Sequence, residues 1–349
     1  MSSTSNSSSK YQDIISKSVL ISSGSPHVYQ LRPKKETFGT MTRMTIGKKN
    51  VGKLNTIIFF VGETGSGKST LINALTNYAM GVKWEDNLRF DLINDEKMDT
   101  SECQTSDVRV YEIFGFEDET LPFSLTLVDT PGFGDTSGVE KDAFIFQRLC
   151  DLLQSEDGVL EAHAVALVLK ASDNRLSDRL MYILDSLMSL FGKDMEDNIV
   201  ALITHSSGRT PKNVLKFLET AQIKCAKNEK NQPPNFLFDN CLTEDRTEEE
   251  DNLKSAHETS MRGMRKFADF LGKIQPRRLG TTCEVLKQRI GLTACIQNLK
   301  ERIKLSELKQ TEISGWWFLM MELPSVLSVK RIVTILDAQR PRVLKSVMS

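Results

Sequence analysis

The chain alternates between two hydrophobic patterns. Short, continuous apolar runs occur at residues 56–61, 108–114, 124–128, 164–169, 198–204 and 235–238. Segments in which apolar residues recur every three or four positions occur at residues 71–75, 175–191, 211–227 and 258–271. Continuous apolar runs are typical of strands buried on both faces, and the longer period is typical of helices that cover a sheet. The order of the two patterns predicts an α/β fold, with a mostly parallel sheet and helices on both faces.

One pair of neighbouring runs departs from this alternation. The runs at 108–114 and 124–128 are separated only by a short acidic turn at 117–120, so we expect them to pair as a hairpin. This hairpin would give the sheet one antiparallel edge strand. Residues 84–105 are charged and punctuated by Asp and Asn, which predicts a loop.

The beginning of the chain differs from the middle. Residues 1–36 are polar and aperiodic, which predicts a disordered tail. The strand and helix patterns define a single predicted domain at residues 53–272. A helical extension is predicted to follow at residues 276–312.

The predicted extension carries an apolar seam. Its members fall at alternating seven-residue spacing and are Val285, Leu292, Ile296, Leu299 and Ile303. Arg289, Ser306 and Gln310 interrupt the seam. The pattern therefore leaves open a coiled coil and a single helix packed on the domain.

The last segment, residues 313–349, is apolar at first and basic afterwards. Its apolar part at 316–321 is broken by Glu322 and Pro324, well short of the roughly 20 residues that a membrane span needs. We expect this part to dock inside the protein. The basic residues that follow leave contact with an anionic membrane surface open, without a spanning segment.

Composition narrows the partners and the compartment. The 45 basic and 46 acidic residues nearly cancel, so no global field favours nucleic acid. The six cysteines show neither a CxxC pair nor another metal-ligand spacing, which fits reduced thiols. The serine-rich N-terminus lacks the apolar stretch of a signal peptide. Together these features predict a cytoplasmic protein.

The clearest chemical signal follows the first apolar run. The segment Gly62-Glu63-Thr64-Gly65-Ser66-Gly67-Lys68-Ser69-Thr70 matches GxxxxGK[ST] between a predicted strand and a predicted helix. Its glycines allow successive backbone N–H groups to face a bound phosphate chain, and the helix N-terminus adds partial positive charge. We expect Lys68 to reach the β- and γ-phosphates and the Ser69 hydroxyl to bind Mg²⁺. The segment predicts a P-loop that binds a nucleotide.

A second motif ends a later apolar run. Asp129 follows the run at 124–128 and precedes Thr130-Pro131-Gly132. In P-loop enzymes a carboxylate at this place holds Mg²⁺, usually through water, because the ion prefers oxygen ligands. The N–H of Gly132 could contact the γ-phosphate, since a glycine permits close approach. Many P-loop ATPases have a glutamate where Thr130 stands, which disfavours an ATP-driven motor or kinase.

Together the two motifs resemble those of the translation-factor-related GTPases. Within that class they are most similar to the septins and to the paraseptins, the immunity-associated and chloroplast-import receptor GTPases. Val128-Asp129-Thr130-Pro131-Gly132-Phe133-Gly134-Asp135 reads almost as in septins, and the resemblance spans residues 55–272. It implies Mg²⁺-dependent GTP binding, slow hydrolysis, and dimers or filaments formed across the nucleotide-bearing face.

The resemblance also implies a threonine whose hydroxyl closes on Mg²⁺ when the γ-phosphate is bound. Thr105, just before the run at 108–114, is best placed, and Thr100 is the alternative. A threonine that merely starts a strand is a third possibility. Catalysis is accordingly assigned to Lys68 and Thr105, and the metal to Ser69, Thr105 and Asp129.

One departure from the GTPase pattern concerns hydrolysis. Phe133 stands where Ras-like GTPases have a glutamine that orients the attacking water. A phenyl ring makes no such hydrogen bond, so we expect slow turnover unless a partner supplies the missing group.

The other departure concerns the base. The usual guanine motif corresponds to Thr204-His205-Ser206-Ser207, in which Ser207 replaces the aspartate. A neutral hydroxyl accepts hydrogen bonds more weakly than a carboxylate, which lowers the expected selectivity for guanine. His205 either stacks on the base or is simply exposed. Asp239 or Asn240 matches the last, base-proximal motif of the family and could restore an acceptor.

These features support a GTP-binding protein with slow Mg²⁺-dependent hydrolysis, acting as a nucleotide-controlled switch or an assembly unit. Two alternatives remain, an oligomerising scaffold with negligible turnover and a binder of nucleoside triphosphates with relaxed specificity. The expected ligands are Mg²⁺ and GTP or GDP, and the expected partner is a second copy paired through the nucleotide face. Whether the protein is an enzyme under physiological conditions stays open.

Overall fold

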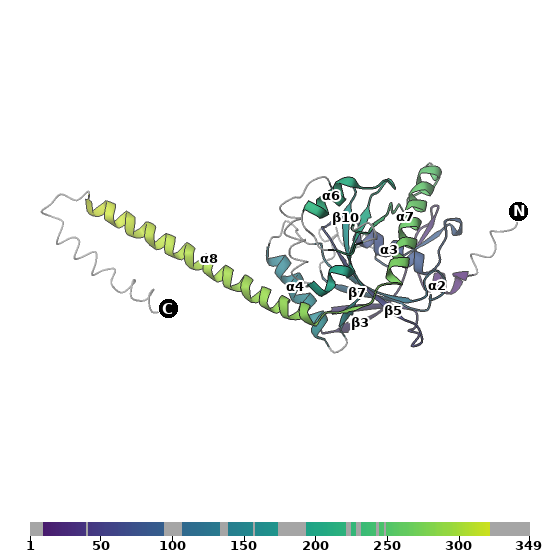
Figure 1. Cartoon of the computed structure of the whole chain (residues 1–349), viewed down its shortest axis with the longest axis horizontal. Helices are drawn as coiled ribbons and strands as arrows, with labels where there is room; N and C mark the ends of the chain where they lie inside the picture. Colours follow the sequence, from purple (N-terminus) through teal and green to yellow (C-terminus); the bar gives the residue numbers. More distant parts are fainter. Residues whose placement is uncertain are drawn as a thin grey trace. The chain divides into compact units, whose positions relative to one another are not determined.

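The structure is a computed structural model of the 349-residue chain. It describes residues 10–39, 41–93, 107–132, 139–155, 158–173, 193–220, 225–227, 232–241, 244–247 and 249–321. The chain divides into two compact units, residues 1–290 and residues 291–349. The first unit holds the sheet and both phosphate motifs (Figure 1).

An eight-stranded sheet forms the centre of the first unit, in the order β12-β11-β10-β5-β8-β7-β4-β3. In chain order its strands are β3 (Lys34–Phe38), β4 (Met41–Ile46), β5 (Asn55–Val61), β7 (Arg109–Ile113), β8 (Ser124–Asp129), β10 (Ala164–Lys170), β11 (Ile199–Thr204) and β12 (Asn235–Leu237). The strands β8, β5, β10, β11 and β12 are mutually parallel. This confirms the predicted α/β fold with a mostly parallel sheet.

The other half of the sheet is larger than predicted. The hairpin of β7 and β8 is confirmed, because the two strands pair antiparallel. The expectation of a single antiparallel edge strand is wrong: β4 pairs parallel with β7, and β3 then pairs antiparallel with β4 to form the edge. Residues 34–46 were not recognised as strands because only scattered positions such as Met41 are buried, which leaves no continuous apolar run.

Helices cover both faces of the sheet, as predicted. On one face, α3 (Lys68–Ala79) and α7 (Glu250–Leu271) share a core with Ile58 and Phe60 of β5. On the other face, α4 (Val139–Gln154) and α6 (Lys212–Thr220) share a core with Phe59 and Val61 of the same strand. Figure 1 shows the two helix pairs on opposite sides of the sheet. Alternate side chains of β5 therefore serve two separate cores.

Several predicted helix boundaries shift. The helix predicted at 211–227 ends at Thr220, and residues 225–227 are not helical. The helix predicted at 258–271 begins at Glu250, because the acidic residues before it extend its first turns. The helix predicted at 175–191 lies outside the described residues. The described connections include two short 3-10 helices, Trp84–Asp86 and Lys193–Asn198.

The N-terminal region is folded from Lys10 onwards, so the predicted disordered tail is wrong for residues 10–36. It contains α2 (Gln12–Ser16), β1 (Val19–Ser22) and β2 (His27–Gln30), and these two strands form a three-stranded sheet with β6 (Leu88–Asp91). The loop predicted at 84–105 is therefore also wrong at β6. Single buried anchors such as Tyr11, whose hydroxyl donates to the Gly81 carbonyl at 2.8 Å, hold this region in place. Anchors this sparse produce no periodic pattern.

Two asparagines of α3 fasten this small sheet to the domain. The side chain of Asn77 donates to the carbonyl of Phe90 and accepts from its N–H, at 2.6 and 2.9 Å. The side chain of Asn73 donates to the carbonyl of Ile93 at 2.8 Å and accepts from the N–H groups of Leu92 and Ile93, both at 2.9 Å. These buried bonds replace the ladder partners that β6 and the residues after it lack on that side.

The predicted extension is one long helix. A short antiparallel pair, β9 (Glu161–Ala162) and β13 (Arg277–Arg278), precedes α8 (Gly280–Met321). The helix runs past the predicted boundary at residue 312, and residues 322–349 lie outside the described part. Within the described residues, no helix is long and apolar enough to cross a membrane.

Candidate functional site

The P-loop connects β5 to α3 and takes a conformation that only glycines adopt easily. Gly65 and Gly67 have φ angles of 74° and 90°, in the left-handed region. At Gly62 a Cβ would lie 2.4 Å from the carbonyl oxygen of Val168, so the strand beside it also demands glycine. Gly67 caps α3 without a side chain, which leaves the first N–H groups of the helix available to an anion.

Lys68 lies across this loop. Its side chain is buried, and its ammonium group donates to the carbonyl oxygens of Gly62 and Glu63, at 3.0 Å each. The loop carbonyls thus hold the charge over the turn where a phosphate chain would be cradled. Ser69 and Thr70 lie in the first turn of α3.

The second motif meets the P-loop directly. Asp129 is the last residue of β8, fully buried, and pairs in register with Phe60 of β5. The hydroxyl of Thr130 donates to the Phe60 carbonyl at 2.9 Å. At Gly132 a Cβ would lie 2.6 Å from both the Cα and the N of Thr64. The two motifs, separate in the chain, are therefore in backbone contact.

Thr204 links the base-side strand to the P-loop. Its hydroxyl donates to the carbonyl oxygen of Ser66 at 2.7 Å. In the same turn, Gly67 lies so close that an added Cβ would be 3.3 Å from Cγ2 of Thr204. His205, which follows, is exposed and has a φ of 50°, a conformation uncommon outside glycine. The backbone thus turns sharply where β11 ends and presents the imidazole to solvent.

The ends of β11 and β12 are joined near the predicted base position. The N–H of Ser206 donates to the carbonyl of Phe238 at 3.0 Å. The N–H of Asp239 donates to the hydroxyl of Ser260, which donates back to the Asp239 carbonyl. The backbone beside the Ser206–Ser207 turn is therefore fixed by α7 as well as by the neighbouring strand.

The side chains of Asp239, Asn240 and Cys241 at this corner are polar and partly buried. Both polar atoms of the Asn240 amide are buried, and within the described part of the chain neither has a hydrogen-bond partner. Burial raises the pKa of the Cys241 thiol to about 12, with a further contribution from the Asp239 carboxylate. The thiol therefore stays protonated at neutral pH and lies 3.8 Å from Oδ1 of Asp239. A buried amide without partners is costly unless a ligand satisfies it.

Some of the predicted site lies outside the described residues, namely Thr105, its alternative Thr100 and Phe133. The structure brings the P-loop, Asp129, Gly132 and Thr204 together, and their roles toward a ligand stay predictions. Among the described residues, no group of three His, Cys, Asp or Glu side chains could hold a metal. The predicted Mg²⁺ site has one carboxylate and draws its other ligands from hydroxyls and phosphates, so it needs no such group.

One cation near the P-loop was missed from the sequence. Lys170 ends β10, in register with Thr204 of β11, and its ammonium lies 3.8 Å from the position a Cβ of Gly65 would occupy. The sequence does indicate this residue, because Lys170 is the last residue of an otherwise apolar strand.

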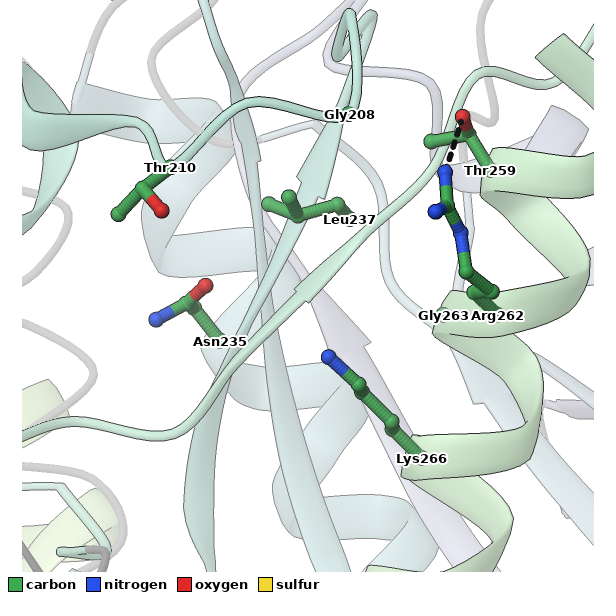
Figure 2. Close-up of a pocket in the computed structure, with 8 residues that line it drawn as sticks. All are labelled: Gly208, Thr210, Asn235, Leu237, Thr259, Arg262, Gly263 and Lys266. Atoms are coloured by element: carbon green, nitrogen blue, oxygen red, sulfur yellow. Dashed lines mark hydrogen bonds between the residues drawn. The ribbon is translucent and has the colours of Figure 1, made fainter. Parts of the chain in front are cut away.

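A small pocket of about 200 Å³ lies between α7, β12 and the loop at residues 205–210 that follows β11. Figure 2 shows Arg262 and Lys266 of α7 on one side of Leu237, with Thr210 and Asn235 on the other. The guanidinium of Arg262 donates to the Thr259 hydroxyl at 3.3 Å, which directs it along the helix (Figure 2). The pocket is cationic and adjoins the loop through Gly208.

Comparison with protein families decides the assignment. The family model described as the AIG1 family matches residues 55–266. The chain belongs to the AIG1 family. It is therefore a P-loop protein of the GTPase type, and the immunity-associated relatives predicted from the motifs are confirmed. The likeness to septins stays a prediction from the two motifs.

Solved structures add a weaker comparison. Toc33 from Arabidopsis thaliana in complex with GDP and Mg²⁺ is 12% identical, with a TM-score of 0.43, over 64% of this chain and 88% of that one. A dimerization-deficient mutant of the same protein is 11% identical, with a TM-score of 0.42, over 62% and 84%. No curated protein matches the chain. We base the family assignment on the family model.

Proposed function

We propose that this AIG1-family protein is a Mg²⁺-dependent GTP-binding switch that hydrolyses GTP slowly. The observation that carries the proposal is the backbone contact between Gly132 and Thr64. It brings the strand end that bears Asp129 against the loop that bears Lys68. A γ-phosphate bound by the loop would lie beside the second motif, so its loss on hydrolysis would be felt by the segment after Gly132.

The residues at the loop have distinct roles in this proposal. Lys68 and the N–H groups of residues 65–69 bind and orient the phosphate chain and stabilise negative charge on it. Ser69, Asp129 through water, and Thr105 would hold Mg²⁺. The ion supplies neutralisation of charge on the phosphate oxygens when it is bound. The start of α3 fits this chemistry, because no side chain caps it.

Slow turnover follows from the residue at position 133. Phe133 cannot orient the attacking water, and a group supplied in trans can be worth about 10³–10⁵ in rate. We propose that a second copy pairs through the nucleotide face, where Gly65 and His205 are exposed, and changes the rate. The surrounding compartment is proposed to be the cytoplasm.

We propose that Asn240 and Asp239 take over base recognition from Ser207. The amide of Asn240 can donate to and accept from a base edge, and both of its polar atoms await partners in the described structure. The Asp239 carboxylate is a charged acceptor at the same corner. Guanine offers such an acceptor a ring N–H and an amino group side by side, and adenine does not, so the carboxylate favours guanine. His205 would lie beside the base from the end of β11.

The test begins with fluorescent GDP, GTP, ADP and ATP analogues titrated into the purified full-length chain with Mg²⁺. We expect guanine nucleotides to bind and adenine nucleotides to compete poorly. Lys68→Ala should abolish binding or turnover, whereas Lys212→Ala, at the exposed start of α6, should leave both unchanged. Unaltered binding and hydrolysis in the Lys68 variant would refute the assignment.

The alternative is an assembly module that stays loaded with nucleotide. Phe133 favours it, because the usual water-orienting group is missing. Single-turnover phosphate release, followed at several protein concentrations, separates the two functions. Release that accelerates with concentration supports a GTPase activated by pairing, and bound GTP that persists throughout supports the scaffold. Equal affinity for ATP and GTP would instead support relaxed specificity.

A further inference from the structure

The helix α8 carries an apolar stripe that the proposed function does not use. Leu292, Ile296, Leu299 and Ile303 are 63%, 52%, 55% and 57% exposed. Every described side chain from residue 291 to residue 314 is exposed. Single exposed aliphatic residues are ordinary, but a row of four on one helix is typical of a surface that binds another protein segment.

The spacing of the stripe identifies the kind of partner. The four residues are separated by four, three and four positions, which places Ile296 and Ile303 at the a positions of a heptad and Leu292 and Leu299 at the d positions. An amphipathic helix that packs on a globular domain usually shows a wider apolar face. β-Branched residues at a with leucine at d favour two parallel strands.

The flanking charges agree with a parallel pair of identical helices. Arg302 then occupies a g position and Glu307 the e position five residues later, where the g residue of one helix meets the e residue of the other. Two-fold symmetry forms this ion pair twice. An antiparallel pairing of the same seam would place Arg302 opposite Cys295 and form no ion pair.

We infer that α8 forms a short parallel coiled coil with a second copy of this chain, centred on residues 292–303. Ser306 and Gln310 occupy the next two seam positions, so the apolar contact ends there. The exposed Leu305 and Leu308 lie off the seam. The contact uses none of the residues assigned to nucleotide binding and does not rest on the proposed GTPase function.

Sedimentation velocity of the full-length chain over a concentration series, with and without GDP and Mg²⁺, tests the inference. We expect a monomer–dimer equilibrium that is already present without nucleotide. The double variant Ile296→Lys/Ile303→Lys should raise the dissociation constant of the dimer at least about tenfold, because four lysines would face one another in the seam. The matched variant Leu305→Lys/Leu308→Lys, equally exposed but off the seam, should leave the equilibrium unchanged.

Thermal unfolding of both double variants checks that the domain stays folded. A wild-type chain that is monomeric at every concentration overturns the inference, as does a nucleotide-free dimer that survives the seam substitutions. A dimer that forms only with nucleotide overturns it too, and points to the nucleotide face.

Cross-linking tests the orientation. In a background carrying Cys295→Ser, Leu292→Cys should form an intermolecular disulfide on mild oxidation, because d residues of parallel helices lie side by side. In an antiparallel pair residue 292 would face residue 303 of the other copy, which leaves the two introduced thiols about 16 Å apart. A dimer that resists this cross-link overturns the parallel arrangement.

Discussion

The hydroxyl of Thr204 donates a hydrogen bond to the carbonyl oxygen of Ser66 over 2.7 Å. This bond joins the end of β11, next to the predicted base position, to the middle of the phosphate loop. Both residues are buried, so the bond is shielded from water. The two halves of a nucleotide site are thus held at a fixed separation by one side chain.

Thr204→Val should weaken nucleotide binding although valine has the same shape. The change leaves the Ser66 carbonyl buried without its donor, at a cost of about 1–3 kcal/mol. We expect a matching loss of affinity for GDP in titration calorimetry, up to about a hundredfold. Thr204→Ser keeps the hydroxyl and should recover most of the affinity. Equal affinity of the valine variant and the wild type would show that the bond does not shape the loop.

Gly132→Ala should disrupt the contact between the two motifs. A Cβ at this position would lie 2.6 Å from Thr64 backbone atoms, so either the strand end or the loop must move. We expect GTP affinity to fall by about tenfold or more, with a lower melting temperature. Gly291→Ala is the matched control, since a Cβ there meets nothing within 4 Å. That control should bind normally and gain up to about 1 kcal/mol in helix stability.

Asn240→Leu should have opposite effects on stability and on binding. Without nucleotide, replacing a buried amide that lacks partners by an apolar group of similar size should leave the free energy of unfolding unchanged or raise it by about 1 kcal/mol. With nucleotide, the lost base contacts should lower GTP affinity by about tenfold and narrow the preference for GTP over ATP. Denaturant unfolding and competition titrations measure the two effects. A variant whose stability falls while its selectivity persists would assign Asn240 a purely structural role.

Acidification should destabilise the protein through His257. Burial, together with Arg89 and Arg246 nearby, lowers the pKa of this imidazole from 6.5 to about 4, while Glu85 acts in the opposite sense. The folded state therefore favours the neutral ring, and the unfolded state binds the proton more readily. The contribution of the neutral His257 ring to the free energy of unfolding is complete above pH 6.5 and is lost as the pH falls toward 4.

His257→Gln should make stability less dependent on pH in that interval. The free energy of unfolding, measured from denaturant curves at half-unit pH steps, should fall less steeply for the variant than for the wild type. Identical slopes would show that other groups account for the acid sensitivity.

The parts predictable from sequence are those with dense local signals. The P-loop needs particular residues at fixed spacing, because glycines and a lysine must act on one phosphate chain, and its place between β5 and α3 was predicted correctly. Asp129 and Gly132 can be recognised in the sequence because they stand at the end of a buried apolar strand and just after it. Both signals depend on neighbours in the chain and need no knowledge of distant contacts.

The parts that failed depend on contacts between distant residues. Tyr11 holds the N-terminal region by one hydroxyl and one ring contact with Phe90, which no periodicity reveals. The strands at residues 34–46 exist because β7 offers an edge to pair with. Lys170 approaches Gly65 only because two strands lie in register. Such features become visible once the sheet order is known.

The hydrogen bonds of Asn73 and Asn77 couple the stability of the N-terminal sheet of β1, β2 and β6 to that of the P-loop at the start of α3. A ligand that orders the loop lowers the free energy of the helix, and Asn77 and Asn73 of that helix donate hydrogen bonds to the carbonyls of Phe90 and Ile93. Binding and stability are linked. Removing or displacing β1 and β2 must therefore lower the ligand's binding free energy by the same amount by which the bound ligand stabilises those strands. The N-terminal segment thereby becomes a handle through which another molecule could load or unload the site from a distance.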